Sequence, residues 1–331
     1  MSQEALLNVV DLSIELTDSV PRRTLVRDVS FTVRQGESVG LVGESGSGKS
    51  MTVKAAMRLL PRAADATGSI EFEGVSVLDM GRRELARYRS SDVAMIHQDP
   101  RAHTNPMQTI GDFLIEGVVS AGLQSKAAAI DRAIGLLDEM GIKDAPRRMA
   151  QYPHQLSGGL LQRVMIASAL MSEPKLVFAD EPTTALDVTV QSEVIAIMVE
   201  QIQERGLGML FITHDLDLAA AVTDSLVVMY AGTVVEKGKA HDIYAGPRHP
   251  YTAALLASRP STTHVKRLVS IPGRPASAYE VPTGCVFAAR CPFATELCRS
   301  DRPVARELDG RVVACHRAEE LTHELKTAAS A

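Results

Sequence analysis

The sequence contains no tryptophan and only 4 % aromatic residues, so it lacks the aromatic surface on which nucleic-acid bases or sugars commonly stack. It also has no excess of basic residues, since the formal net charge is −5 and the isoelectric point is about 6.0. Nucleic-acid-binding proteins usually carry a basic patch, so we expect no nucleic-acid partner. No apolar run approaches the roughly 18 residues that would cross a bilayer, and the N-terminus has no signal-peptide pattern. These absences predict a soluble, cytoplasmic protein.

The remaining composition is that of an ordinary globular protein. The 331 residues are 45 % hydrophobic and 23 % charged, and this length suits one large domain and a smaller one. The four cysteines all lie between residues 285 and 315. In a reducing compartment disulfides are the less expected use for them.

Residues 43–50, GESGSGKS, match the phosphate-loop pattern GxxxxGK[ST]. An apolar strand is expected before them at 38–42, and a helix after them at 51–60, which Pro61 ends. In that setting backbone N–H groups and the helix N-terminus surround phosphate, Lys49 reaches the β- and γ-phosphates, and the Ser50 hydroxyl binds Mg²⁺. The alternative is a glycine-rich turn that binds nothing. The expected nucleotide-binding residues here are Gly43, Glu44, Ser45, Gly46, Ser47, Gly48, Lys49, Ser50 and Met51.

Two adjacent carboxylates, Asp180 and Glu181, follow a second apolar strand at 175–179. Open α/β sheets place their ligands at the carboxyl ends of strands, and a Mg²⁺-nucleotide would neutralise such a pair. Asp180 is then expected to orient Mg²⁺ and Glu181 to polarise the water that attacks the γ-phosphate. A solvated pair of acids at the end of a strand is the alternative interpretation.

Periodicity predicts strands that alternate with helices, which indicates an α/β fold with a mostly parallel sheet core, an antiparallel β edge and a helical insert at about 100–170. Each motif occurs once, so the chain holds the parts of a single nucleotide site. The expected strands are 9–16, 29–33, 38–42, 68–74, 93–96, 175–179, 209–213 and 224–230, with a hairpin arm at 232–238. The expected helices are 51–60, 111–119, 126–140, 160–171 and 188–204.

Taken in order over residues 5–245, these motifs resemble the ATP-binding subunits of ABC transporters. Leu156-Ser157-Gly158-Gly159 is similar to that family's signature, Gln98 to its Q-loop, Ala185-Leu186-Asp187 to its D-loop and His214 to its switch histidine. The resemblance implies that Gln98 joins the ATP and Mg²⁺ site and that His214 contacts the γ-phosphate. Taken alone, His214 would more often be a core histidine.

The same resemblance implies a dimer in which two ATPase domains pack head to tail. Ser157, Gly158 and Gly159 would then act on the ATP of the partner domain, and Asp187 would lie in the D-loop. Closure of the dimer would exclude water, and hydrolysis would reopen it.

Residues 152–159, 162–167 and 182–191 resemble oligopeptide/dipeptide importers more narrowly, and most closely the first (D-type) of their two ATPase subunits. His249-Pro250-Tyr251-Thr252 is similar to the "HPY" segment that opens that subfamily's C-terminal extension; without the family it predicts only a helix start. We therefore expect an ATPase domain over 1–245 and an extension over 246–331. The implied partners are a second ATPase subunit (a heterodimer), two transmembrane permease subunits and, indirectly, an external peptide-binding protein, at the cytoplasmic face of the inner membrane.

Two positions depart from the family pattern. Most relatives have an aromatic residue near position 20 that stacks on adenine, whereas this chain has Val20-Pro21-Arg22-Arg23. Adenine packing is then either weaker or supplied by Arg22 or Arg23. Leu160 stands where the signature usually has glutamine.

Cys285, Cys291, Cys298 and Cys315 have the spacing C-x5-C-x6-C-x16-C, without the paired C-x2-C knuckles of a zinc ribbon. Four thiolates can hold zinc or an iron–sulfur cluster, and four free cysteines are the third possibility. The subfamily resemblance implies a [4Fe–4S] cluster with a structural role. We expect the ligands in short loops and the segment 259–331 to bury little apolar surface of its own.

Two rival functions remain at this point. A soluble ABC-type ATPase that acts on nucleic acid or ribosomes disagrees with the neutral-to-acidic charge and the HPY segment. A regulatory subunit that binds ATP without hydrolysing it disagrees with Lys49, Glu181 and His214.

Overall fold

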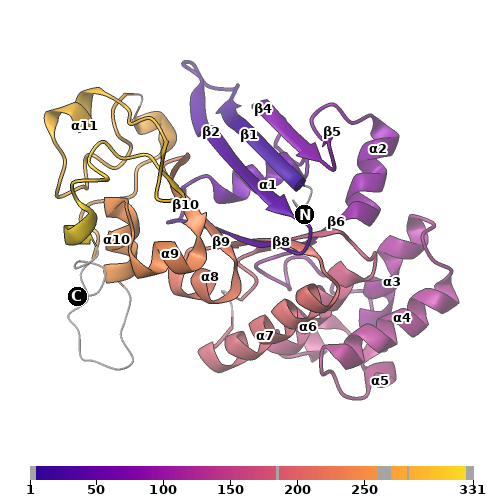
Figure 1. Ribbon diagram of the computed structural model, residues 1–331. Coiled ribbons are helices and arrows are strands. Elements are labelled where there is room, and N and C mark those ends of the chain that lie inside the picture. Colours follow the sequence, from indigo (N-terminus) through magenta and orange to yellow (C-terminus); the bar gives the residue numbers. More distant parts are fainter. Residues whose placement is uncertain (1–4, 184–185, 259–269, 282, 326–331) are drawn as a thin grey trace. The chain divides into compact units, whose positions relative to one another are not determined.

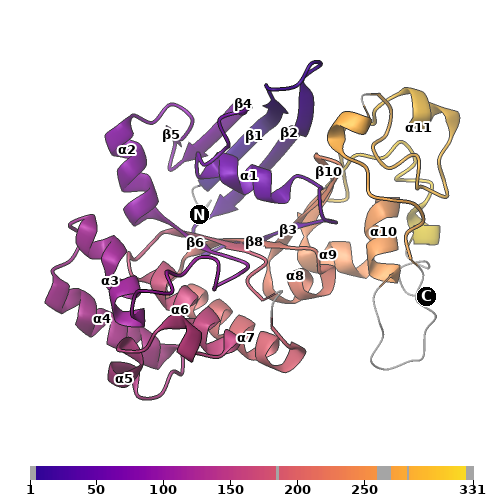
Figure 2. The same ribbon diagram turned by 180° about the vertical axis from the view of Figure 1, so that it is seen from behind.

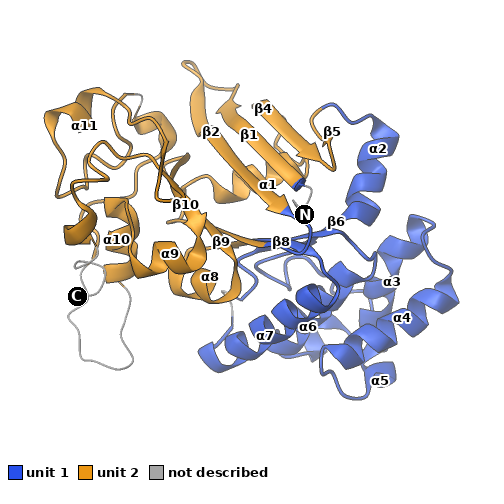
Figure 3. Cartoon of the chain, viewed as in Figure 1, with its two compact units in different colours: residues 1–6, 34–37, 79–210 blue, residues 7–33, 38–78, 211–331 orange. Residues whose placement is uncertain are grey.

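The chain forms two units, shown in two colours in Figure 3. Unit 1 comprises residues 1–6, 34–37 and 79–210, and unit 2 comprises residues 7–33, 38–78 and 211–331. The computed structural model describes residues 5–183, 186–258, 270–281 and 283–325. In these ranges no helix is long and apolar enough to cross a membrane.

Unit 1 contains the expected helical insert, and Figures 1 and 2 show its helices α3 to α7 gathered together. Two parallel strands, β6 and β7, pair in register from Val93↔Leu176 to Ile96↔Ala179. The elements are α2 (Arg82–Arg87), a π-helical turn (Tyr88–Asp92), β6 (Val93–Ile96), α3 (Ile110–Ser120), α4 (Lys126–Glu139), α5 (Ala145–Met149), a 3₁₀ turn (Pro153–Gln155), α6 (Gly158–Leu170), β7 (Leu176–Asp180) and α7 (Val188–Glu204). The strand β8 (Gly208–Thr213) begins in unit 1 and ends in unit 2.

Four helices of unit 1, α3, α4, α6 and α7, begin at polar capping residues. Thr109, Ser125, Ser157 and Asp187 each accept a hydrogen bond from a backbone N–H of the first turn that follows. Such caps satisfy N–H groups that have no partner within the helix, and each typically stabilises it by about 1 kcal/mol. The start of each helix is therefore encoded locally, which is why the predicted starts lie within two residues of the observed ones.

Unit 2 contains an antiparallel sheet of strand order β2-β1-β4-β5. Its strands are β1 (Ala5–Leu16), β2 (Arg23–Arg34), β4 (Ala64–Phe72) and β5 (Val75–Ser76), and Leu7 pairs with Phe72 and Leu16 with Ala64. Alternate residues of β1 and β2, among them Leu12, Ile14 and Val29, are fully buried, which is the period-2 pattern of a half-buried sheet. The antiparallel β edge is confirmed.

A second group of strands in unit 2 has the order β11-β12-β10-β9-β3, and β3 runs parallel to β9 from Val39↔Ser225 to Val42↔Val228. The strands are β3 (Ser38–Val42), β9 (Ser225–Tyr230), β10 (Thr233–Lys239), β11 (Arg306–Leu308) and β12 (Arg311–Val313). The helical elements are α1 (Lys49–Ala56), α8 (Leu216–Val222), α9 (Ala240–Ala245), α10 (Pro250–Ala257), a 3₁₀ turn (Ala278–Glu280) and α11 (Glu296–Ser300). Together the two units give the predicted α/β class.

The C-terminal extension adds a strand to the sheet, because its strand β12 pairs with β10, Glu236 opposite Val313. Its apolar clusters are small, and one of them contains Val313, Cys315 and Ala318. The expectation that all four cysteines lie in loops was wrong, because Cys298 lies in α11.

Candidate nucleotide site

The phosphate loop joins the fully buried strand β3 to helix α1, as expected. Glycine is required at two of its positions. A Cβ atom on Gly43 would lie 2.2 Å from the carbonyl oxygen of Met229, and Gly48 has a φ of +100° at the N-cap of α1. No other residue fits the first position, and an L side chain at the second would be strained. The two glycines thus allow the tight turn into α1 by which phosphate loops surround an anion with backbone N–H groups and a helix N-terminus.

Lys49 is the first residue of α1, and its side chain is held by the loop itself. Its Nζ atom donates hydrogen bonds to the carbonyl oxygens of Gly43 at 2.6 Å and Glu44 at 3.0 Å, and the residue is only 5 % exposed. A buried ammonium group is expensive unless its donors are satisfied. These two carbonyl contacts therefore keep the ammonium group in the loop. When a nucleotide binds, phosphate oxygens can replace the carbonyl oxygens as acceptors.

Glu44, the second residue of the loop, is bound by two side chains of the C-terminal extension. Arg290 Nη1 lies 2.6 Å from Glu44 Oε2, and Arg290 Nη2 lies 3.2 Å from Glu44 Oε1. The backbone N–H of Glu44 donates to the hydroxyl oxygen of Tyr251 at 2.8 Å. The Arg290 side chain is 6 % exposed, so the two-pronged ion pair is largely shielded from water. The extension thereby fixes the conformation of the phosphate loop.

Arg290 is itself held in place by the extension and by strand β9. Its Nε atom donates to the carbonyl oxygen of Pro272 at 2.8 Å, and its guanidinium lies 5.7 Å from the ring centroid of Tyr230. The rings of Tyr230, Tyr251 and Phe287 pack together with centroids 4.7 to 5.4 Å apart. Sequence reasoning missed Arg290, whose only local signal is its place directly before Cys291.

The HPY segment has a physical role in this contact. The Glu236 carboxylate accepts hydrogen bonds from the backbone N–H groups of Arg248 and His249, which anchors the start of α10. Burial lowers the pKa of His249 to about 3, so its imidazole is neutral, and its Nδ1 atom accepts the N–H of Tyr251 at 3.1 Å. The segment thus directs the Tyr251 hydroxyl at Glu44.

His214 follows β8 and is exposed to solvent. The next residue, Asp215, caps α8 by accepting the N–H of Leu218 at 3.0 Å. The structure therefore excludes the core-histidine interpretation. His214 directly follows the buried strand β8, just as the phosphate loop directly follows the buried strand β3.

In unit 1, Asp180 and Glu181 stand at the end of β7, and Gln98 follows β6. The Gln98 Nε2 atom donates to Glu181 Oε2 at 3.2 Å, so the structure brings together the proposed Q-loop and the proposed general base. Glu181 has a φ of +45°, a left-handed backbone that is uncommon for a residue other than glycine. Such a conformation is kept where the surrounding structure enforces it, often at functional sites.

The Ser157-Gly158-Gly159 turn forms the start of α6. Ser157 is the exposed N-cap residue, and a Cβ atom on Gly159 would lie 2.4 Å from Val190 Cγ1 of α7. Helix α7 begins at the cap Asp187, so the signature and the D-loop aspartate belong to one packed pair of helices in unit 1. Ala185 of the predicted D-loop lies outside the described residues.

The four cysteines come together around one small pocket of unit 2, which is also lined by His249, Phe287 and Phe293. Burial, with a contribution from the neighbouring cysteines, raises the pKa of Cys291 and of Cys315 to about 11. Within the described ranges, no three His, Cys, Asp or Glu side chains are arranged to hold one metal ion. The convergence of the cysteines is therefore shown, but a single-ion geometry is not.

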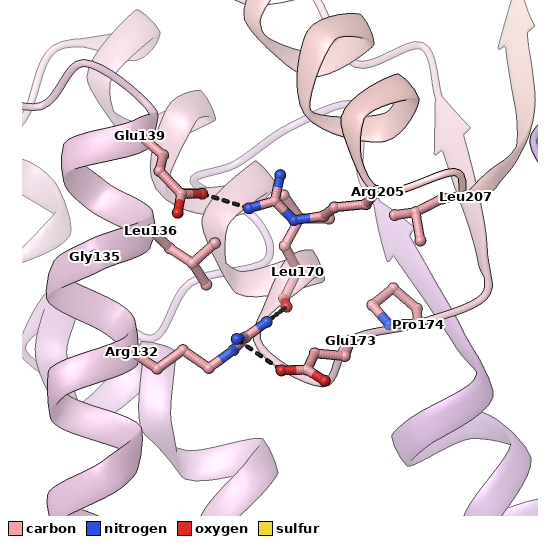
Figure 4. A pocket seen from close by; sticks show the side chains of 9 residues that line it. All are labelled: Arg132, Gly135, Leu136, Glu139, Leu170, Glu173, Pro174, Arg205 and Leu207. Carbon is pink, nitrogen blue, oxygen red and sulfur yellow. Dashed lines mark hydrogen bonds and ion pairs between the residues drawn. The ribbon is translucent and has the colours of Figure 1, made fainter.

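A surface pocket of unit 1 is a weaker candidate for a ligand (Figure 4). Arg132 donates to the carbonyl oxygens of Leu170 and Met171 and pairs with Glu173 at 2.7 Å. Arg205 pairs with Glu139 and also donates to Gln201. Both guanidinium groups are used internally, so this pocket is explained by the packing of α4 against the end of α6.

Two family models match the chain: "ABC transporter" over residues 26–184, and "Oligopeptide/dipeptide transporter, C-terminal region" over residues 235–298. The dipeptide transport ATP-binding protein DppD of Escherichia coli is 45 % identical over 316 residues, which cover 94 % of this chain and 96 % of that protein. The oligopeptide transport ATP-binding protein OppD of Salmonella typhimurium is 42 % identical over 311 residues, covering 94 % and 93 %. Among solved structures, cbiO1 of Clostridium perfringens, part of an ABC transporter complex, is 26 % identical with a TM-score of 0.64, and covers 73 % of this chain and 92 % of that one.

Proposed function

Because the chain belongs to the ATP-binding subunits of ABC transporters, among the dipeptide and oligopeptide transport ATP-binding proteins, we propose that it binds and hydrolyses ATP to power peptide import through a membrane permease. The observation that carries the proposal is similarity over nearly the whole chain, extension included, to relatives named for peptide transport. An ATPase of nucleic acid or ribosomes would not account for the similarity of the extension.

We assign the chemistry to named residues. Lys49 and the N–H groups of residues 43–51 bind the phosphates, and Ser50, Gln98 and Asp180 hold Mg²⁺ directly or through water. Glu181 accepts a proton from the attacking water, and His214 contacts the γ-phosphate. The Gln98–Glu181 hydrogen bond supports this assignment because it fixes the carboxylate that has to take the proton.

The chain acts in a dimer of ATPase domains at the cytoplasmic face of the inner membrane. The chain holds one copy of each motif, so a complete pair of ATP sites requires a second, different ATPase subunit. Ser157, which is exposed, and the two glycines that follow it act on the ATP bound by that subunit. Two permease subunits contact the helical insert and the region around Gln98. An external peptide-binding protein delivers the substrate to the permease.

ATPase activity of the chain alone and in the assembled transporter tests this function. Purified alone at micromolar concentration, the chain should hydrolyse ATP slowly, because no partner phosphate loop meets its signature. Assembly with the second subunit and the permeases should raise the rate, with peptide-loaded binding protein raising it further. Fast turnover by a demonstrated monomer, independent of its concentration, would contradict the dimer.

We further propose that Cys285, Cys291, Cys298 and Cys315 hold a [4Fe–4S] cluster with a structural role. Their convergence on one pocket supports it. Four thiolates are the ligand set that a four-iron cluster takes, and the four cysteines at this pocket would supply it. A zinc ion bound by the same four thiolates is the alternative. The cluster would crosslink the segments of the extension that carry the four cysteines.

Metal analysis of anaerobically purified protein tests the cluster. We expect about four irons per chain, a brown colour and broad absorption near 400 nm. Cys291→Ser should remove the iron and destabilise the extension, because the crosslink then has one ligand too few. One zinc and no iron would replace the cluster with a zinc site, and neither metal would mean four ordinary thiols.

A further inference from the structure

An exposed tyrosine of the C-terminal extension lies against an arginine of strand β2. The guanidinium carbon of Arg23 is 5.3 Å from the centroid of the Tyr279 ring, and Tyr279 remains 42 % exposed. Both residues belong to unit 2, together with the phosphate loop. The pair thus combines two flat, polarisable groups, which are the groups on which nucleic-acid bases stack.

Strand β2, which begins at Arg23, contacts the phosphate loop. Arg23 is the first residue of β2, and Leu25 and Val26 follow it. A Cβ atom on Gly48 would lie 3.0 Å from Val26 Cγ2 and 3.3 Å from the carbonyl oxygen of Leu25. Strand β2 therefore packs on the phosphate loop two residues after Arg23.

The tyrosine side is joined to the same loop by Gly232. A Cβ atom there would lie 2.8 Å from the Cβ atom of Ala278, the residue before Tyr279. The N–H of Gly232 donates to the carbonyl oxygen of Ser47 at 3.0 Å. Residues close to Arg23 and to Tyr279 in the sequence are therefore in contact with the phosphate loop or with Gly232, which is hydrogen-bonded to it.

Tyr279 is held in place by the turn that carries it. Glu280 accepts two hydrogen bonds from the Arg274 guanidinium, at 2.7 and 3.1 Å, and one from the N–H of Ser277 at 2.9 Å. The N–H of Ala276 donates to the hydroxyl oxygen of Tyr230 at 3.2 Å. A fixed ring loses little conformational freedom when a ligand stacks on it.

We propose that Arg23 and Tyr279 form the platform on which the base of ATP stacks. The inference rests on the proposed ATP-binding function and adds the residues that recognise the base. The phosphates lie at the N-terminus of α1, and the base lies over the exposed faces of the tyrosine ring and the guanidinium. The turn at 20–23 has no aromatic residue, and the extension supplies Tyr279 in its place.

Calorimetric titration of the full-length chain with Mg-ATP and with Mg-tripolyphosphate separates base binding from phosphate binding. Tyr279→Ala should weaken ATP binding about tenfold, because one stacked base is lost, and should leave the affinity for tripolyphosphate unchanged. Tyr279→Phe should restore ATP binding, since the ring and not the hydroxyl does the stacking. Arg23→Ala should show the same selective loss. Tyr244→Ala, at another partly exposed tyrosine (38 %) of unit 2, is the matched control and should bind both ligands normally.

If folded Tyr279→Ala binds ATP as tightly as wild type does, the platform is overturned. The proposed function would still stand in that case, because ATP binding through Lys49 would be unaffected. An equal loss of ATP and tripolyphosphate would also overturn it, because Tyr279 would then shape the loop and not bind the base. A folded wild-type chain that binds tripolyphosphate but not ATP would overturn both the platform and the proposed function.

Discussion

We expect the Glu181→Gln variant, assembled in the complete transporter, to hydrolyse ATP at least about 100-fold more slowly than wild type. Glutamine has nearly the same shape as glutamate but cannot accept a proton from water. Its Oε atom can still accept the hydrogen bond that Gln98 Nε2 now makes to Glu181 at 3.2 Å, so the site should keep its arrangement. ATP should therefore bind normally and accumulate in a closed dimer.

Single-turnover hydrolysis and equilibrium ATP binding, measured on the same preparation, distinguish this role from a structural one. Glu204→Gln is a matched control, because Glu204 lies at the end of α7 and also accepts a hydrogen bond from a glutamine, Gln201, at 3.4 Å. It should hydrolyse ATP at the wild-type rate. A wild-type rate for Glu181→Gln would show that Glu181 is not the general base.

The second large effect is expected on binding. Lys49→Ala should lower the affinity for Mg-ATP by about 100-fold, since hydrogen bonds to charged groups are typically worth about 1.5 to 3 kcal/mol each. The ammonium now contacts the carbonyl oxygens of Gly43 and Glu44 and would exchange them for phosphate oxygens. The loop should keep its shape without it, because Arg290 and Tyr251 hold Glu44 independently.

Titration with Mg-ATP and thermal unfolding of the same variant test this prediction together. Lys54→Ala, an exposed lysine in the last turn of the same helix, should bind ATP like wild type. An ATP affinity for Lys49→Ala within about twofold of wild type would contradict the proposed role of Lys49; RT ln 2 is a small fraction of one charged hydrogen bond.

The sequence was sufficient wherever the signal is local. The strands Ser38–Val42 and Val93–Ile96 and the helix Val188–Glu204 lie at their predicted bounds, because buried runs, capping residues and glycines act over a few neighbours. The helix predicted over 51–60 ends early, at Ala56, since Arg58 has a φ of +53°. Short elements such as α8 and β12 were missed because they are too short to show a period.

What could not be predicted is the contact between distant segments. Arg290 and Glu44 are 246 residues apart, and neither neighbourhood signals the other. The same holds for the contact between Arg23 and Tyr279. The sequence suggested that Arg22 or Arg23 stacks on adenine, but it gave no sign that Tyr279 lies beside Arg23. The motifs thus indicated the reaction, whereas the way in which the extension braces the phosphate loop required the three-dimensional structure.

The central claim, that this chain couples ATP hydrolysis to peptide import, is tested most directly by peptide uptake into proteoliposomes. The vesicles contain the assembled transporter, ATP is enclosed on the side of the ATPase subunits, and labelled peptide with its binding protein is added outside. Wild type should accumulate peptide, whereas Glu181→Gln should bind ATP and accumulate none. Equal accumulation by wild type and Glu181→Gln, or hydrolysis by wild type without any uptake of peptide, would contradict the account.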